Sequence, residues 1–127
     1  MTPFAIYFHD LRRRHQVSQK DLAKIIGYKQ GYISGLECGR KNPTNEEFIS
    51  KLIAGLNLDD DEQAALRQAV EESQRNYKLP DNASAEVSRM INKLWHEIEN
   101  LNLAQIKIIT EVLQLRDSRT SSSNEVR

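Results

Sequence analysis

The sequence has a single cysteine, Cys38, and so no pair with which to form an internal disulfide. A reducing cytoplasm is the expected setting for such a chain. No apolar run approaches the roughly 20 residues that a membrane-spanning helix needs. The three histidines, His9, His15 and His96, are scattered and have no carboxylate or cysteine at ligand spacing, so we expect no metal site.

Patterns that would indicate an enzyme are also missing. The sequence has no Ser/His/Asp or Cys/His arrangement, no glycine-rich phosphate loop and no motif of paired carboxylates. No segment shows the alternation of apolar and polar residues that is typical of β-strands. We therefore expect an all-α protein that is not an enzyme and carries no cofactor.

The net charge of the 127 residues is zero, but the charges are segregated along the chain. Residues 1–42 hold eight Lys/Arg and three Asp/Glu, a net charge of +5. Residues 43–81 hold four and nine, a net charge of −5, and residues 82–127 hold six of each. A basic segment beside an acidic one indicates a surface selected for an anion.

Apolar residues at helical spacing predict five helices before residue 80. We expect them at residues 4–15, 18–27, 30–39, 44–56 and 59–79. Three capping pairs mark helix starts: Ser18 with Asp21, Thr44 with Glu47, and Asp59 with Glu62. The expected buried side of the second helix consists of Leu22, Ala23, Ile25 and Ile26.

A second pattern begins after the apparent boundary at Pro80-Asp81-Asn82. Apolar residues step there by four and three, as in a heptad seam, at Val87, Ile91, Leu94, Ile98 and Leu101. Asn102 can cap a further helix that carries Leu103, Ile106, Ile109, Val112 and Leu113. The sequence thus predicts a head over residues 1–79, a helical hairpin over 82–116 and a disordered tail over 117–127.

The second and third predicted helices are separated by only a few residues around Gly27. Two helices joined by so tight a turn can present one of them outward, and an α-helix fits the major groove of DNA, which is about 12 Å wide. Ala23 is expected to be small because the helices cross there, and Gly27 because the turn needs a positive φ. Ile33 and Leu36 would anchor the third helix and leave its other positions facing outward.

At these residues the sequence resembles the Cro/lambda-repressor-like helix-turn-helix family, also called the XRE family, over residues 4–70. The matching pattern is Ser18-Gln19, Leu22-Ala23, Gly27, Ile33-Ser34, Leu36-Glu37 and Gly39. The resemblance implies a five-helix lambda-repressor-like DNA-binding domain, which the C-terminal helical hairpin follows.

The resemblance also implies roles at the matching positions. Gln19 would touch a phosphate and brace the reading helix, and the Gln30 amide would pair with adenine. Arg12 and Glu37 match a structural salt bridge between the first and third helices. Groove positions fall at or beside Gly31, Tyr32, Ser34 and Gly35, and phosphate contacts at Arg40 and Lys41.

Two positions depart from the family pattern. Lys29 stands where a Ser or Thr usually caps the third helix, which costs about 1 kcal/mol unless a DNA phosphate compensates. Gly35 stands where a long polar side chain often reads a base, so more of the specificity is expected to come from DNA shape. Tyr32 either packs on the rim of the core or contacts a base. For Arg13 and Arg14, the charge of their segment favours DNA over a solvated face.

A hairpin of 35 residues cannot bury a self-sufficient core, and helix-turn-helix heads usually bind as two-fold dimers. Trp95 either packs within the hairpin or anchors an interface. The residues expected to mediate dimerisation are Val87, Ile91, Leu94, Trp95, Ile98, Ile106, Ile109 and Leu113.

We therefore expect a cytoplasmic, homodimeric repressor that binds double-stranded DNA at a (pseudo)palindromic operator, with higher oligomers on DNA left open. Its layout is similar to that of small phage and prophage immunity repressors. There is no room for a β-rich self-cleavage domain, so release from DNA is expected through an antirepressor partner or competition. The alternative is an antitoxin whose hairpin masks a toxin and whose head autoregulates the operon. A helical adaptor that does not bind DNA is a weaker third option.

Overall fold

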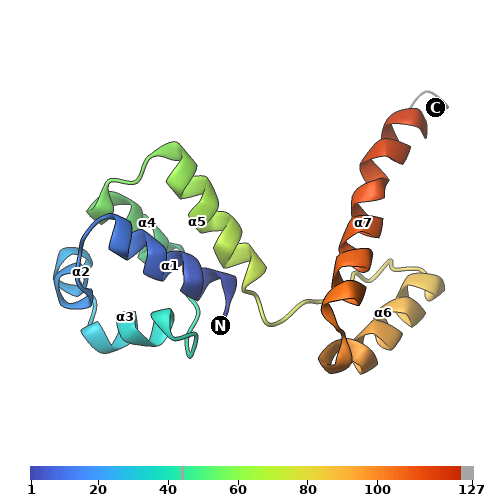
Figure 1. Ribbon diagram of the computed structural model, residues 1–127, viewed down its shortest axis with the longest axis horizontal. Coiled ribbons are helices and arrows are strands. Elements are labelled where there is room, and N and C mark those ends of the chain that lie inside the picture. The colour runs from blue at the N-terminus through green and yellow to red at the C-terminus, as the bar shows by residue number, and fades with distance from the viewer. Residues whose placement is uncertain (44, 124–127) are drawn as a thin grey trace. The chain divides into compact units, whose positions relative to one another are not determined.

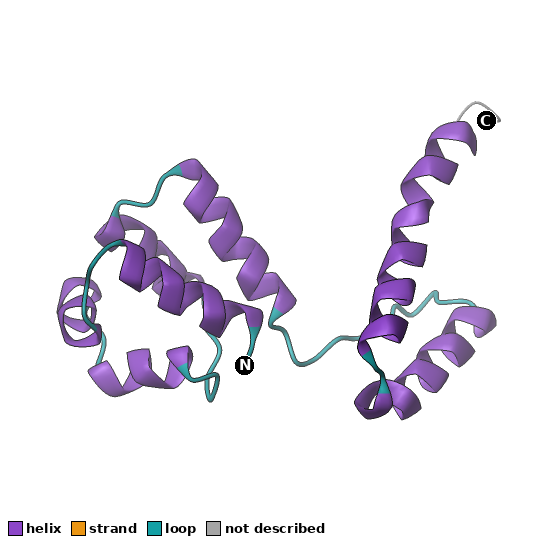
Figure 2. Ribbon diagram, in the orientation of Figure 1, coloured by secondary structure: helices purple, strands orange, loops and turns teal. Residues whose placement is uncertain are grey.

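The computed structural model describes the backbone of residues 1–43 and 45–123, and the side chains of residues 1–43 and 45–115. Every regular element within these residues is a helix (Figures 1 and 2), and the expected all-α fold is confirmed. The chain divides into two units, Met1–Tyr77 and Lys78–Arg127. No helix in the described residues combines the length and the apolar character needed to cross a membrane.

The first unit contains five helices, α1 (Pro3–Arg14), α2 (Gln19–Ile26), α3 (Gln30–Glu37), α4 (Glu46–Leu56) and α5 (Asp60–Glu72). Two of the predicted caps open their helices. The Ser18 hydroxyl accepts a hydrogen bond from the Asp21 N–H at 3.0 Å, and Asp59 and Glu62 form a reciprocal capping box. Gly27 ends α2 with a φ of 77°, the left-handed conformation that the turn was expected to need.

The cap of helix α4 lies one residue later than the sequence predicts. Its cap is Asn45, whose side chain accepts a hydrogen bond from the Phe48 N–H at 2.9 Å, whereas Thr44 lies outside the described residues. Asparagine and threonine are both good caps, because each has a short side chain with an oxygen acceptor.

Helix α5 ends at Glu72, seven residues before the predicted end near Leu79. The Ser73 hydroxyl donates to the carbonyl of Ala69 at 2.7 Å and accepts the N–H of Phe4 at 2.8 Å. This pair of bonds fixes the end of α5 to the start of α1. Residues 74–84, which follow, have no regular secondary structure.

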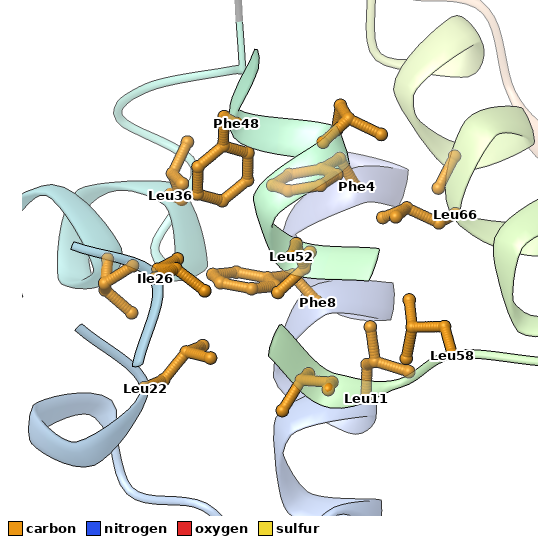
Figure 3. Packing of buried hydrophobic residues seen from close by; sticks show 14 of the residues in the cluster. Phe4, Phe8, Leu11, Leu22, Ile26, Leu36, Phe48, Leu52, Leu58 and Leu66 are labelled. Carbon is orange, nitrogen blue, oxygen red and sulfur yellow. The ribbon is translucent and has the colours of Figure 1, made fainter. Parts of the chain in front are cut away.

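Three phenylalanines form the centre of the first unit (Figure 3). The rings of Phe4 and Phe8 on α1 stack with centroids 5.3 Å apart, and Phe48 on α4 meets Phe8 edge to face at 6.0 Å. The other buried members of the core are Leu11, Leu22, Ala23, Ile26, Ile33, Leu36, Ile49, Leu52, Leu56, Leu58, Leu66 and Ala69. All five helices contribute, so the core fixes the direction in which α3 points.

Ile25 does not belong to this core, contrary to the expectation from its helical spacing, and 51% of its surface is exposed. Helix α2 crosses α4 so closely that a Cβ atom at Gly55 would lie 2.9 Å from methyl carbons of Ile25 and Ile26. Ile25 therefore packs at the edge of this crossing, while Ile26 and Leu22 point into the core.

Glu37, near the end of α3, is a buried carboxylate that joins three helices. It forms the implied salt bridge with Arg12 of α1, whose Nη2 also donates to Oε1 at 3.1 Å. His9 Nδ1 lies 2.9 Å from the same oxygen, and Gln19 Nε2 of α2 donates to it at 3.3 Å. Burial raises the pKa of Glu37, but the hydrogen bonds from Arg12, His9 and Gln19 outweigh it and hold this pKa below its ordinary value.

The second unit contains α6 (Ala85–Glu97), the short 3-10 helix η1 (Ile98–Asn100) and α7 (Leu103–Ser123). Asn102 and Gln105 form reciprocal capping bonds at the start of α7. The predicted continuous seam is interrupted, because α6 ends at Glu97 and Ile98 lies in the tighter 3-10 turn. Helix α7 runs to Ser123, beyond the predicted end at residue 116, and residues 124–127 of the predicted tail lie outside the described residues.

The second unit is much less well covered than the first. None of its described side chains, residues 78–115, is buried. Leu94, Leu101 and Ile109 are half-buried, and Trp95 is 70% exposed. The hairpin thus leaves most of its apolar surface in contact with solvent.

Replacing the buried carboxylate tests its role in the fold. We expect Glu37→Gln to lower the free energy of unfolding by about 2–3 kcal/mol, because Arg12 loses its charged partner in a buried place. Urea denaturation measures this difference. The matched control is Glu47→Gln, which breaks an exposed pair with Lys51 and should cost less than about 0.5 kcal/mol. Equal effects of the two substitutions would contradict the assignment.

The lowered pKa of Glu37 also predicts how stability depends on pH. A carboxyl whose pKa is lower in the folded chain than in the unfolded chain stabilises the fold at pH values above its pKa in the unfolded chain, here 4.5. This contribution is lost as the pH falls from that value through the lower pKa of the folded chain. The stability difference between wild type and Glu37→Gln should therefore shrink from pH 6 towards acid, to about pH 3. Denaturation curves at several pH values would show a constant difference if Glu37 made no such contribution.

Candidate nucleic-acid interface

Helix α3 is held on one side only. Ile33 and Leu36 are fully buried, whereas Lys29, Gln30 and Gly31 at its start are exposed. Lys29 occupies the cap position and makes no side-chain capping bond, as the sequence indicated. The beginning of α3 therefore presents the Gln30 amide and the positive end of the helix dipole to solvent.

Gln19 connects the two helices of the motif. It is the first residue of α2, and its bond to Glu37 reaches the last residue of α3. The start of α2 is thereby held against the end of α3. Gln19 thus lies beside α3 and joins it to α2.

Tyr32 packs on the rim of the core, one of the two placements that the sequence leaves open. Its ring stacks on Tyr28 with centroids 5.3 Å apart, and both rings meet Phe48 edge to face. Burial, and to a smaller extent the neighbouring Tyr28, raises the pKa of Tyr32. Two lysines lie over these rings, Lys41 over Tyr32 at 5.5 Å and Lys51 over Tyr28 at 5.4 Å.

Gly35 is buried and does not lie open on the outer side of α3. The aliphatic chain of Lys41 covers it, so that a Cβ atom at Gly35 would lie 3.2 Å from Lys41 Cδ. Lys41 folds back over α3 because its backbone N–H donates to the Gly35 carbonyl at 3.1 Å. The departure at Gly35 is thus explained by packing within the protein.

The turn after α3 is fixed at both its sides. Gly39 has a φ of 82°, and its carbonyl accepts a hydrogen bond from Arg75 Nη2 at 2.8 Å. The start of the chain also lies there, since a Cβ atom at Gly39 would be 3.8 Å from Met1 Cα. Arg40, next in the chain, is exposed.

The structure does not bring Arg14 to α3. The Arg14 guanidinium lies over the Tyr7 ring at 5.6 Å, and the Tyr7 hydroxyl donates to the Glu62 carbonyl of α5. Helix α1 lies between α3 and α5 in Figure 1 and contacts both. Arg14 therefore belongs to the α5 side of α1, whereas Arg12 faces α3. Arg13 is exposed and lines a shallow hollow with Tyr7, Asp10 and Arg14.

Two contributors to this region were not predicted from the sequence. His9 bonds to Glu37 across α1 and α3, and no motif signals that contact. Tyr28 stacks on Tyr32, which its spacing of four residues could have suggested. Among the described residues, no group of three or more His, Cys, Asp or Glu is placed to hold a metal ion.

Comparison with known proteins agrees with this geometry. A family model with the description "Helix-turn-helix domain" matches residues 3–66, which is half of the chain, from the start of α1 into α5. A search of curated proteins and a search of solved structures found no match. The matched segment contains the tight turn at Gly27, the exposed start of α3 and the core that holds both helices. The chain belongs to the helix-turn-helix domain family.

Proposed function

We propose that the protein is a sequence-specific transcriptional repressor that binds double-stranded DNA as a homodimer. The observation that carries this proposal is the exposed start of α3, with Gln30 and the cap residue Lys29, in a helix-turn-helix domain. Arg40 and Lys41 follow the other end of α3. A helix with cations beyond both ends suits the major groove and the phosphates on either side of it.

The distribution of charge supports the same orientation. The segment that contains α1, α2 and α3 carries a net charge of +5, whereas residues 43–81, which include α4 and α5, carry −5. A polyanion attracts the basic side of such a domain and repels the acidic side. The domain would therefore approach DNA with α3 in front.

The exposed apolar surface of the second unit supports self-association. Ile106, Ile109 and Leu113 share one side of α7, at about 100° per residue, and Ile108 and Val112 lie on another. Ile108 and Val112 are 60% and 57% exposed. Ile106 and Leu113 are also exposed, at 45% and 67%. A helix with two apolar sides needs neighbours on both, as in a four-helix bundle.

A second copy of the hairpin would supply the missing neighbours. Residues 82–127 hold six basic and six acidic residues, so net charge does not oppose their pairing. Isolated units of this size rarely bury enough apolar surface to be stable, and pairing would bury more of it. The residues that would line the bundle are Val87, Ile91, Leu94, Trp95, Ile98, Ile106, Ile109 and Leu113, together with Ile108 and Val112 on the other apolar side of α7.

A two-fold dimer of such heads would recognise a (pseudo)palindromic operator. A small DNA-binding head followed by a pairing hairpin is the layout expected of a phage or prophage immunity repressor. We assign the protein to that functional class, with release from DNA through a partner protein.

Two substitutions separate base reading from phosphate binding. Gln30→Ala should cost about 1–3 kcal/mol of binding free energy on the operator and relax specificity at one position. Arg40→Ala should weaken binding to all sequences alike and reduce the salt slope by about 1. Anisotropy titrations at several salt concentrations, on a duplex selected from a random pool, measure both effects.

Arg14→Ala is the matched control for Arg40→Ala, because each removes one exposed arginine. Arg14 lies beside α5, so its loss should leave affinity nearly unchanged. If the wild type failed to associate even with bulk genomic duplex at low salt, the proposal would be wrong.

The pairing of hairpins is tested by a charge placed on the unpartnered side of α7. Val112→Glu should weaken the dimer at least about tenfold, because pairing would have to bury the new charge. Sedimentation equilibrium measures the change. The neighbouring substitution Glu111→Gln, on the polar side of α7, should leave the dimer intact. A wild type that sediments as a monomer at micromolar concentration would contradict the model of pairing. A stable complex between the hairpin and a toxin would favour the antitoxin alternative.

A further inference from the structure

Gly31, the second residue of α3, is a glycine for which the free protein has no evident need. It is exposed, its φ is not positive, and a Cβ atom added to it would have nothing within 4 Å. Glycine within a helix is less favourable than alanine because it loses more conformational freedom on folding. A residue with a side chain would fit this place in the free protein without strain.

The other four glycines of the sequence each have a structural reason. Gly27 and Gly39 have positive φ values of 77° and 82°. A Cβ atom at Gly55 would lie 2.9 Å from methyl carbons of α2, and Gly35 lies under the side chain of Lys41. The absence of a side chain at Gly31 thus points to something outside the chain.

The neighbours of Gly31 indicate what approaches it. Gln30, which precedes Gly31 in the sequence, is exposed. Ser34, three residues after Gly31, is half-buried and lies near the same side of α3. Tyr32 points to the rim of the core. Apart from the Gln30 amide, the outer side of α3 therefore carries only short side chains, and a serine hydroxyl reaches a base edge only if the helix backbone lies close to it.

We propose that Gly31 is the point of closest approach between α3 and the floor of the major groove, and that Gln30 and Ser34 read bases at this short distance. The inference rests on the proposed DNA binding and adds the residue that sets the depth of α3. A methyl group at position 31 would displace the helix outward. The hydrogen bonds of both reading residues would then lengthen beyond bonding range.

The substitution Gly31→Ala tests the proposal because its effects on folding and on binding should have opposite signs. The free protein should melt about 2–6 °C higher, since alanine restricts the unfolded chain and meets no obstacle. Affinity for a duplex of about 30 base pairs, long enough for two half-sites and enriched by the wild type from a random pool, should fall at least about tenfold. Affinity for mixed genomic duplex at the same salt should change less than about threefold, because phosphate contacts persist.

Two further variants separate distance from chemistry. Ser34→Ala removes a hydroxyl without adding volume, so it should relax discrimination at one base position and leave the depth of α3 unchanged. Gln30→Ala should weaken binding to the enriched duplex in the wild-type background. In the Gly31→Ala background it should have little further effect, because Gln30 there already lies too far from the base to bond to it. Additive losses from Gln30→Ala and Gly31→Ala would overturn the inference.

The outcomes distinguish this inference from the proposed function. If the wild type binds neither the enriched nor the genomic duplex, DNA binding is wrong and the inference is overturned with it. If the wild type binds and Gly31→Ala binds equally well, only the inference is overturned. A lower melting temperature for Gly31→Ala would show that the fold itself needs the glycine. An equal loss of affinity for both duplexes would place the contact at the phosphates. Either result would also overturn the inference.

Discussion

The buried carboxylate of Glu37 is the interaction on which the placement of α3 depends. Apolar packing through Ile33 and Leu36 holds the helix against the core, but such packing is not directional. The contacts of Glu37 with Arg12, His9 and Gln19 add direction, because charge-assisted hydrogen bonds have narrow geometry. A carboxylate without these partners would be costly to bury, so α1, α2 and α3 form one unit.

This arrangement separates the supported side of α3 from its exposed beginning, on a helix of only eight residues. The residues that hold α3 lie on its inner side and at its end, and the tyrosines and Lys41 cover its flank. What remains outward is the beginning of the helix, with Gln30 and Gly31. If α3 enters DNA as we propose, so small a contact surface would give weight to the two-fold repetition of the head and to the shape of the DNA.

Local chemistry made much of the fold predictable. The caps at Ser18 and Asp59, the turn at Gly27 and the apolar spacing of α1 and α4 each depend on neighbours within a few residues. The misses involve distant contacts. The end of α5 is set by the bond of Ser73 to Phe4, 69 residues away, and the position of Ile25 depends on which helix packs beside it. The outward direction of Gln30 was predictable from Ile33 and Leu36, but the covering of Gly35 by Lys41 was not.

The position of Met1 beside Gly39 has a practical consequence. The first residue of the chain lies next to the turn that leads into Arg40 and Lys41. An affinity tag fused ahead of Met1 would start from the side that we propose faces the nucleic acid, and in the proposed complex a polyhistidine tag would crowd the phosphates there. Material for binding assays is therefore best made with its tag at the opposite end of the polypeptide or with the tag removed.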